Sequence, residues 1–506
     1  RKFLLAAIAV FTLFSAKAQL TDADINTAKQ VVAKNSVAIG LSAEELNNII
    51  VSSTYLSVEG IRMVYLYQGY KGIPVYNQMY VLAFKNDKVV SVAGGGIPSL
   101  DQKVNIKSGV PAITVQEAVK AAFAESKIDL QFVRGSMDAP VLNAWRKLDF
   151  GKLGVSDLNV TAELMWVPVA DKQVKLAWQI FVSPLNSSDM WQIRVDAQDL
   201  SIIGKDNLTV YDHWSKDEHA TIKNDRKFIF EEKNYVGARK NEIRPFTGYK
   251  MPVVNSATYR VVRYPAESPQ HPGGAPSLHT DPWTMAPGNA TTLKWHNDGI
   301  VEHDSTRGNN VYAAEDRNNT NSVIDKAAVS QTPQPTLTFD YAPDFTQAPT
   351  VTTPPNQQFN ITNLFYMNNI MHDIVYQYGF NEVSGNFQKD NMGRGGLGND
   401  HVFGDAQDGG GTNNANFATP ADGSNPRMQM YIWTAANPDR DGDVDNGIIA
   451  HEFGHGISNR LTGGPANSGC VGNAEHWGEG WSDYYALMVT TNWATATVTD
   501  GALPRP

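Results

Sequence analysis

His451-Glu452-Phe453-Gly454-His455 has the pattern H-E-x-x-H inside a helical stretch that we expect over Gly447–Leu461. Residues four apart on a helix lie on one face, one turn above each other, so both imidazoles can bind one metal ion. Glu452 lies about 100° around the helix from His451, close enough to contact a water on that ion. Apolar side chains fall broadly on the opposite side and let the helix be buried: Ile449, Phe453 and Ile457.

A catalytic zinc site takes three protein ligands and leaves a fourth position open. A second helical stretch, expected at about Gly478–Val489, offers Glu479 as the third ligand, with Glu452 as general base. Asp483 follows four residues later on the same face, where it can accept a hydrogen bond from a ligating histidine. Glu475 and His476 stay open as alternative third ligands on chemistry alone.

An acidic run precedes the first helix and resembles the start of a calcium loop: Asp439, Asp441, Asp443 and Asp445. If Asp441 is position one, position six is Asn446 instead of glycine, and position twelve is Glu452 itself. One glutamate cannot serve both sites, so we do not expect a regular EF-hand. A looser calcium site, or a solvated turn, remains open.

The 506 residues allow two to four domains, and the formal charge of −10 argues against nucleic acid as a partner. Cys470 is the only cysteine, so no disulfide can form within the chain. We expect it to be a packed residue and not a nucleophile.

The first 18 residues predict an export signal. Arg1 and Lys2 precede an apolar stretch over residues 3–14, and Ala16-Lys17-Ala18 fits a small-x-small cleavage site. No later segment reaches the length of a membrane span. We therefore expect the mature chain to act outside the cytoplasm.

The rest of the chain divides into three parts by composition. Residues 19–205 combine a helical stretch, Asp22–Lys34, with alternating strand patterns, of which Trp191–Asp196 should be half exposed. Residues 206–250 are richer in charge and fit an exposed, cleavable junction. Residues 251–506 are rich in Pro, Gly, Asn and Thr, with a helix expected over Ile361–Tyr378. The fold class is thus α+β.

The motifs around the two histidines closely resemble the fungalysin family of secreted metallopeptidases. Its segments here are Asn413–Pro420, Arg427–Trp433, Arg440–Gly447, His451–Gly464 and Gly478–Asp483. The resemblance implies a thermolysin-like catalytic fold and a secreted zinc endopeptidase that hydrolyses extracellular proteins and peptides. It also implies that Asn414 and Ala415 lie on an edge strand that pairs with the substrate backbone.

Gly72-Ile73-Pro74-Val75-Tyr76 is similar to the fungalysin/thermolysin propeptide. The similarity implies that residues 19–205 inhibit the enzyme, as an intramolecular partner, until proteolysis removes them. Family members continue beyond the Glu479 helix into a helical lobe that walls the cleft. We therefore expect the catalytic domain to be incomplete here, and this chain could be inactive where its parent is an enzyme.

Two other functions compete with the enzyme. A catalytically inactive, peptidase-like binding protein would need a damaged site, whereas all four positions are intact. A structural zinc site in an adhesive protein would be closed, whereas this one has an open position and an adjacent glutamate.

Overall fold

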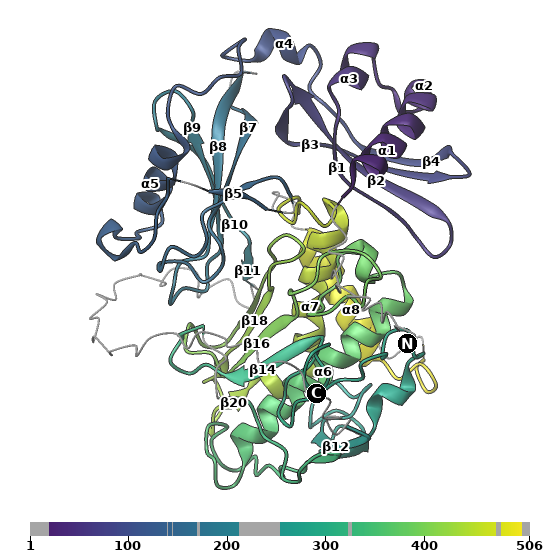
Figure 1. Ribbon diagram of the computed structural model, residues 1–506. Helices are drawn as coiled ribbons and strands as arrows, with labels where there is room; N and C mark the ends of the chain where they lie inside the picture. The colour runs from purple at the N-terminus through teal and green to yellow at the C-terminus, as the bar shows by residue number, and fades with distance from the viewer. Residues whose placement is uncertain are drawn as a thin grey trace, which may run out of the picture.

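The computed structural model describes residues 20–138, 140–143, 145–169, 173–211, 254–321, 326–471 and 477–497. The predicted signal at 1–18 lies outside these residues, as does most of the predicted junction, residues 212–250. The described residues form a front unit, up to residue 211, and a back unit from residue 254. Figure 1 shows the front unit above the back unit, with the helices α7 (Asn446–Thr462) and α8 (Trp477–Thr490) side by side in the latter.

The front unit holds a sheet of ten strands in two parts, which are joined where β3 pairs with β7 in parallel at Val75 and Trp166. Three of its helices begin with capping boxes, at Thr21, Ser42 and Thr114. Its helices are α1 (Asp22–Lys34), α2 (Ser36–Ile39), α3 (Ala43–Asn48), α4 (Leu100–Lys103) and α5 (Val115–Glu125). Its strands are β1 (Ile50–Leu56), β2 (Ile61–Tyr70), β3 (Ile73–Lys85), β4 (Lys88–Gly94), β5 (Val141–Leu142), β6 (Leu148–Asp149), β7 (Thr161–Pro168), β8 (Val174–Val182), β9 (Trp191–Asp196) and β10 (Ile202–Asn207).

The expectation that β9 is half exposed is wrong, because five of its six residues are buried. Ile193 and Val195 pack in the same apolar core as residues of α5. On the other face, the Arg194 guanidinium stacks 4.0 Å from the Tyr76 ring centroid and pairs with Asp206 at 2.6 Å. The alternation of polar and apolar residues in β9 does not reveal that Arg194, on the polar face, is buried by its contacts with Tyr76 and Asp206.

The back unit places its sheets around a long central helix, α6 (Asn356–Gln377), which packs against β12, β14, β16 and α7. Its main sheet has the order β11-β17-β18-β16-β14, and a smaller one has the order β13-β12-β15. The segment Arg427–Trp433 forms two strands, β18 and β19, that are separated at Tyr431. The strands are β11 (Thr209–Tyr211), β12 (Ser256–Val261), β13 (Ser277–Thr280), β14 (Val311–Glu315), β15 (Thr336–Phe339), β16 (Val402–Ala406), β17 (Ala415–Ala418), β18 (Arg427–Met430), β19 (Ile432–Trp433) and β20 (Arg440–Asp441).

The strand β11 joins the two units. It belongs to the chain that leaves the front unit, yet it pairs antiparallel with the edge of the back unit's main sheet, with Val210 opposite Phe417. Contacts between side chains and the other unit support this pairing. Tyr65 Oη donates to the carbonyl of Leu461 at 3.0 Å, and Trp145 Nε1 donates to the carbonyl of Asp422 at 2.8 Å.

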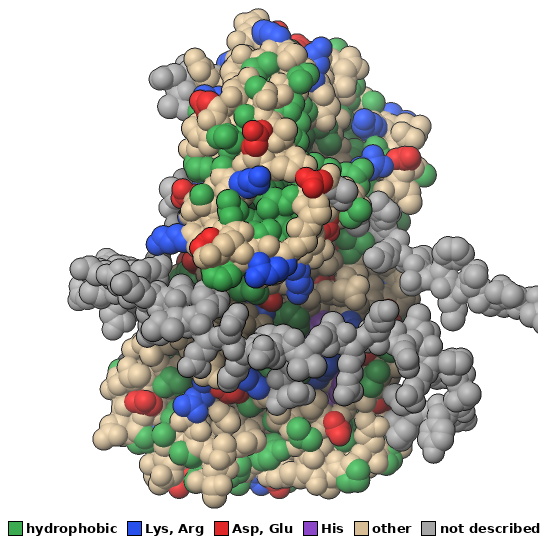
Figure 2. All heavy atoms as spheres, turned by 60° about the vertical axis from the view of Figure 1, so that its left-hand side comes forward, with side chains coloured by type: hydrophobic (Ala, Val, Ile, Leu, Met, Phe, Trp, Pro, Cys, Tyr) green, Lys and Arg blue, Asp and Glu red, His purple; other side chains and the backbone are tan. Residues whose placement is uncertain are grey.

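No helix among the described residues is both long and apolar enough to cross a bilayer. On the face shown in Figure 2, acidic and basic side chains are scattered over both units without a large patch of one sign.

Candidate metal centre

The helix α7 carries the H-E-x-x-H residues on a buried, well-capped element. The Asp445 side chain accepts hydrogen bonds from the backbone N–H groups of Gly447 and Ile448, which the first turn of a helix leaves without partners. The helix is buried at the motif, where His451, Glu452 and His455 are almost completely inaccessible to solvent. The helix therefore holds both imidazoles in fixed positions.

Gly454, inside the motif, lets α8 approach α7 closely. A Cβ atom added to Gly454 would lie 2.9 Å from the Cα atom of Ser482 on α8, too close for the present packing. The absence of a side chain there lets the backbones of the two helices come together. This contact brings Glu479, three residues before Ser482, beside the histidines.

The three predicted ligands converge. Nitrogen or oxygen atoms of His451, His455 and Glu479 all lie within 4.8 Å of one another. Glu479 Oε2 is 3.1 Å from His451 Nε2 and 3.5 Å from His455 Nε2. In a tetrahedral zinc site with metal–ligand distances of about 2.0–2.1 Å, neighbouring ligand atoms are about 3.3–3.4 Å apart. Two imidazole nitrogens and one carboxylate oxygen at these separations fit zinc.

Asp483 lies on the other side of the His451 ring. Its Oδ1 is 2.9 Å from His451 Nδ1, while the Nε2 of the same ring faces Glu479. A carboxylate on Nδ1 fixes the ring orientation and keeps Nε2 available as a metal ligand. Glu452 is fully buried next to His451 in the sequence. The arrangement brings together three side chains that could hold a metal ion, a carboxylate beside one of them and a buried second glutamate.

The two residues expected to contact substrate lie at the start of β17. Ala415 is the first residue of this strand and pairs with Met430 of β18, and the carbonyl of Asn414 accepts the N–H of Tyr431. The other side of β17 is occupied by β11 of the incoming chain. In this structure a segment of the chain itself pairs with that edge.

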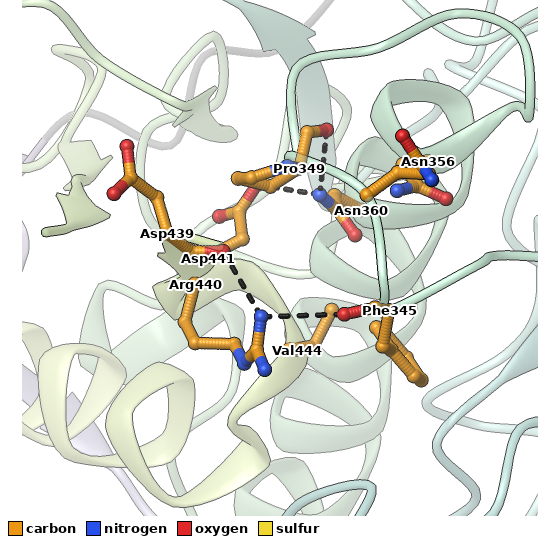
Figure 3. Close-up of a pocket in the computed structure, with 9 residues that line it drawn as sticks. Phe345, Pro349, Asn356, Asn360, Asp439, Arg440, Asp441 and Val444 are labelled. Carbon is orange, nitrogen blue, oxygen red and sulfur yellow. Dashed lines mark hydrogen bonds between the residues drawn. The ribbon is translucent and has the colours of Figure 1, made fainter. Parts of the chain in front are cut away.

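The acidic run before α7 is not a regular calcium loop. Asp441 Oδ2 accepts hydrogen bonds from the amides of Asn360, at 2.6 Å, and Gln407, at 2.7 Å. Asp445 caps α7. In Figure 3, which shows a small pocket of about 20 Å³, the carboxylate of Asp439 points away from Asn360. These aspartates serve different local roles.

The cysteine and the remaining histidine and glutamate candidates can be placed as follows. Burial raises the pKa of the Cys470 thiol to about 12, and its sulfur packs 3.5 Å from Met79 Sδ, as a packed residue would. His372, on α6, is also buried, and its Nδ1 lies 2.9 Å from Asp373 Oδ1. Glu475 and His476, the alternative ligands, lie outside the described residues.

Sequence reasoning missed two residues that hold the centre in place. The sequence analysis did not predict a role for Gly454, although a glycine inside a buried helix indicates that another backbone approaches closely. Arg460, at the far end of α7, is fully buried and donates to the carbonyls of Pro420 and Gly385 and to Asp400. Arg460 directly follows the polar residues Ser458 and Asn459, so nothing in the sequence signals its burial.

Comparison with known proteins gives two family matches. Residues 258–503 match the family described as fungalysin metallopeptidase (M36), and residues 49–95 match the fungalysin/thermolysin propeptide motif. Extracellular metalloproteinase 3 of Trichophyton tonsurans is 34% identical over 457 residues, which cover 87% of this chain and 60% of that protein. Extracellular metalloproteinase 3 of Trichophyton equinum is 46% identical over 240 residues, 47% of this chain and 36% of that protein. Extracellular metalloproteinase 2 of Trichophyton rubrum is 44% identical over 240 residues, with the same coverage. The chain thus spans 60% or less of the length of these relatives.

Proposed function

The chain belongs to the fungalysin metallopeptidase family, and from that membership we propose that it is the precursor form of a secreted zinc-dependent endopeptidase. The observation that carries the proposal is the convergence of His451, His455 and Glu479 beside a buried Glu452. A domain division into a signal at 1–18, an inhibitory region at 19–205, a junction at 206–250 and a catalytic domain from 251 is part of the same proposal. So is a thermolysin-like fold for the catalytic domain.

The chemistry follows from the donor set. Bound zinc would lower the pKa of water towards about 7 and polarise the scissile carbonyl. His451, His455 and Glu479 would hold the ion, and Asp483 would keep the His451 ring oriented through Nδ1. Glu452 would take the proton of the attacking water and pass it to the leaving amine.

Substrate recognition is proposed for the edge of β17. Asn414 and Ala415 would hydrogen-bond an extended peptide through the backbone, which tolerates many sequences. The pairing of β11 with β17 supports this, because the chain itself already uses that edge as a site for strand addition. Protein and peptide substrates are therefore the expected partners.

The same pairing supports inhibition by the front unit. A strand that occupies the substrate edge must leave before substrate can bind, and β11 is continuous with β10 of the front unit. We propose that proteolysis beyond β11 releases this block. N-terminal sequencing of the secreted product would locate the cut, and a product that retains residues 19–211 while active would contradict inhibition.

Casein digestion by the secreted protein tests the enzyme itself. Activity should disappear with a zinc chelator and return when zinc is added back. A catalytically inactive binding protein would bind zinc yet cleave nothing, and the intact set of four site residues speaks against it. A calcium requirement stays a prediction of the sequence.

A further inference from the structure

Three aspartates meet in the back unit at the carboxyl ends of two parallel strands. Asp316 follows β14, Asp405 lies in β16 opposite Ala314, and Asp408 comes just after β16. One carboxylate oxygen of each lies within 4.8 Å of the others, and all three side chains are buried. Neighbouring parallel strands end at the same edge of a sheet, which explains why residues so far apart in sequence converge.

The surrounding charges do not balance this cluster. Arg427 pairs with Asp405 and, at 2.8 Å, with Asp157 of the front unit. Lys326 lies 3.6 Å from both Asp316 and Glu315. Among the described residues in these pairs and the cluster, five carboxylates face two cations. Buried charge is costly unless it is paired. Two further positive charges would nearly neutralise the excess negative charge of the cluster.

Two buried oxygens at the cluster have no hydrogen-bond donor within the described part of the chain. One is Asp405 Oδ1, and the other is Oε1 of Gln429, a residue that is fully buried on β18 opposite Asp405. Gln429 reaches the cluster through Nε2, which donates to Asp408 Oδ2 at 2.9 Å. Asp316 and Asp408 also accept hydrogen bonds, from Thr320, Asn321 and Gly410. Buried acceptors nearly always have a partner, and two unpaired oxygens in an oxygen-rich cluster suit a hard cation.

The titration of the cluster agrees with this geometry. Burial raises the pKa of Asp405 to about 7, opposed by Arg427 and reinforced by Asp316 and Asp157. Burial and the charge of Asp405 also raise the pKa of Asp408.

We propose that Asp316, Asp405 and Asp408, with Gln429 Oε1, form a binding site for one divalent cation of the calcium type. Carboxylate and amide oxygens in an irregular arrangement suit calcium better than magnesium, which demands near-octahedral geometry. The cation would tie the 316–321 loop to β16. Asn321 of that loop donates to the Ser187 carbonyl of the front unit at 2.9 Å, so the site also supports the contact between the units.

Calorimetric titration of the full chain with calcium tests the proposal, in a Glu452→Gln background that prevents self-cleavage. We expect one calcium per chain and a higher melting temperature when calcium is bound. Asp408→Asn keeps the side-chain volume and should weaken binding by at least about tenfold, as loss of a metal-site group typically does. Asp439→Asn makes the same change on an exposed residue of the acidic run and should leave the affinity unchanged.

Two results would overturn the proposal. One is a parent chain that binds no calcium, and the other is equal affinity in the parent and in Asp408→Asn. A loss confined to Asp439→Asn would also overturn it, because the cation would then lie in the acidic run. If Asp408→Asn does not fold, Gln429→Leu removes a ligand without changing the charge, and unchanged calcium affinity in that variant would equally contradict the site.

Discussion

Asp483 and His451 are in contact across two helices, with Oδ1 2.9 Å from Nδ1, although they lie 32 residues apart in the sequence. The contact leaves Nε2 of the ring facing Glu479 Oε2 at 3.1 Å. Both nitrogens of the His451 ring therefore face a carboxylate, Nδ1 that of Asp483 and Nε2 that of Glu479. Removing its partners should therefore have graded effects on metal binding.

We expect His451→Ala and Glu479→Ala to lose zinc during dialysis, because each removes one of three ligands. Asp483→Asn should retain stoichiometric zinc but bind it about 10–100-fold more weakly, since it only orients a ligand. Zinc content against free zinc concentration, measured by atomic absorption, separates the two classes. Equal zinc affinity in Glu479→Ala and the parent chain would remove Glu479 from the ligand set.

Gly454→Ala should also weaken zinc binding, although residue 454 touches no ligand atom. The new methyl group would meet the backbone of Ser482 at 2.9 Å and push α8 away from α7, carrying Glu479 with it. Gly480→Ala on α8 is the matched control, because a Cβ there meets nothing within 4 Å. Alanine also favours the helix by up to about 1 kcal/mol. Normal zinc affinity in Gly454→Ala would show that the close contact of the helices does not position Glu479.

Asp157→Ala should loosen the front unit from the back unit. Asp157 pairs with the buried Arg427 at 2.8 Å, and losing one partner of such a pair weakens an interface by at least about tenfold. After cleavage between residues 211 and 254, gel filtration at decreasing concentration would report the dissociation. Asp22→Ala breaks an exposed pair with Arg146 within the front unit and should change nothing. Equal dissociation of the two variants would deny Asp157 a role.

His296 should make the back unit less stable in acid. Burial lowers its pKa from 6.5 to about 3, and its Nε2 lies 2.6 Å from Tyr259 Oη. The unfolded chain binds the proton first, so this contribution is present above pH 6.5 and is lost as the pH falls towards 3. The free energy of unfolding should fall by at most about 1.4 kcal/mol per pH unit from this group. In His296→Phe the urea-unfolding profile should be flatter by that amount, and an unchanged pH slope would contradict the assignment.

Much of the centre could be predicted from sequence because its signals are local. Helical spacing placed His451 and His455 on one face, and the expected range Gly447–Leu461 is within one residue of the observed limits of α7. Glu479 and Asp483 were recognisable because they share a second helix at a spacing of four. The predicted limits of α8 were also within one residue.

The features that sequence could not supply depend on which strands become neighbours. Asp316 and Asp405 are 89 positions apart by their numbers and meet only because β14 and β16 pair in parallel. Arg427 finds Asp157 only when the front unit docks. The acidic run at 439–445 suggested a calcium site because its charges lie close together in the sequence. The buried cluster of Asp316, Asp405 and Asp408 forms only when β14 and β16 pair, so the sequence did not indicate it.

The most direct test of the central claim combines zinc content with casein hydrolysis in the Glu452→Gln variant. We predict that this variant keeps one zinc per chain, because residue 452 is not a ligand, and that it loses peptide hydrolysis, because glutamine cannot accept the proton of water. The protein with Glu452 unchanged, after removal of its front unit, should also bind one zinc per chain and should digest casein. Hydrolysis by Glu452→Gln at the parent rate, or a parent protein that binds no zinc, would contradict the account.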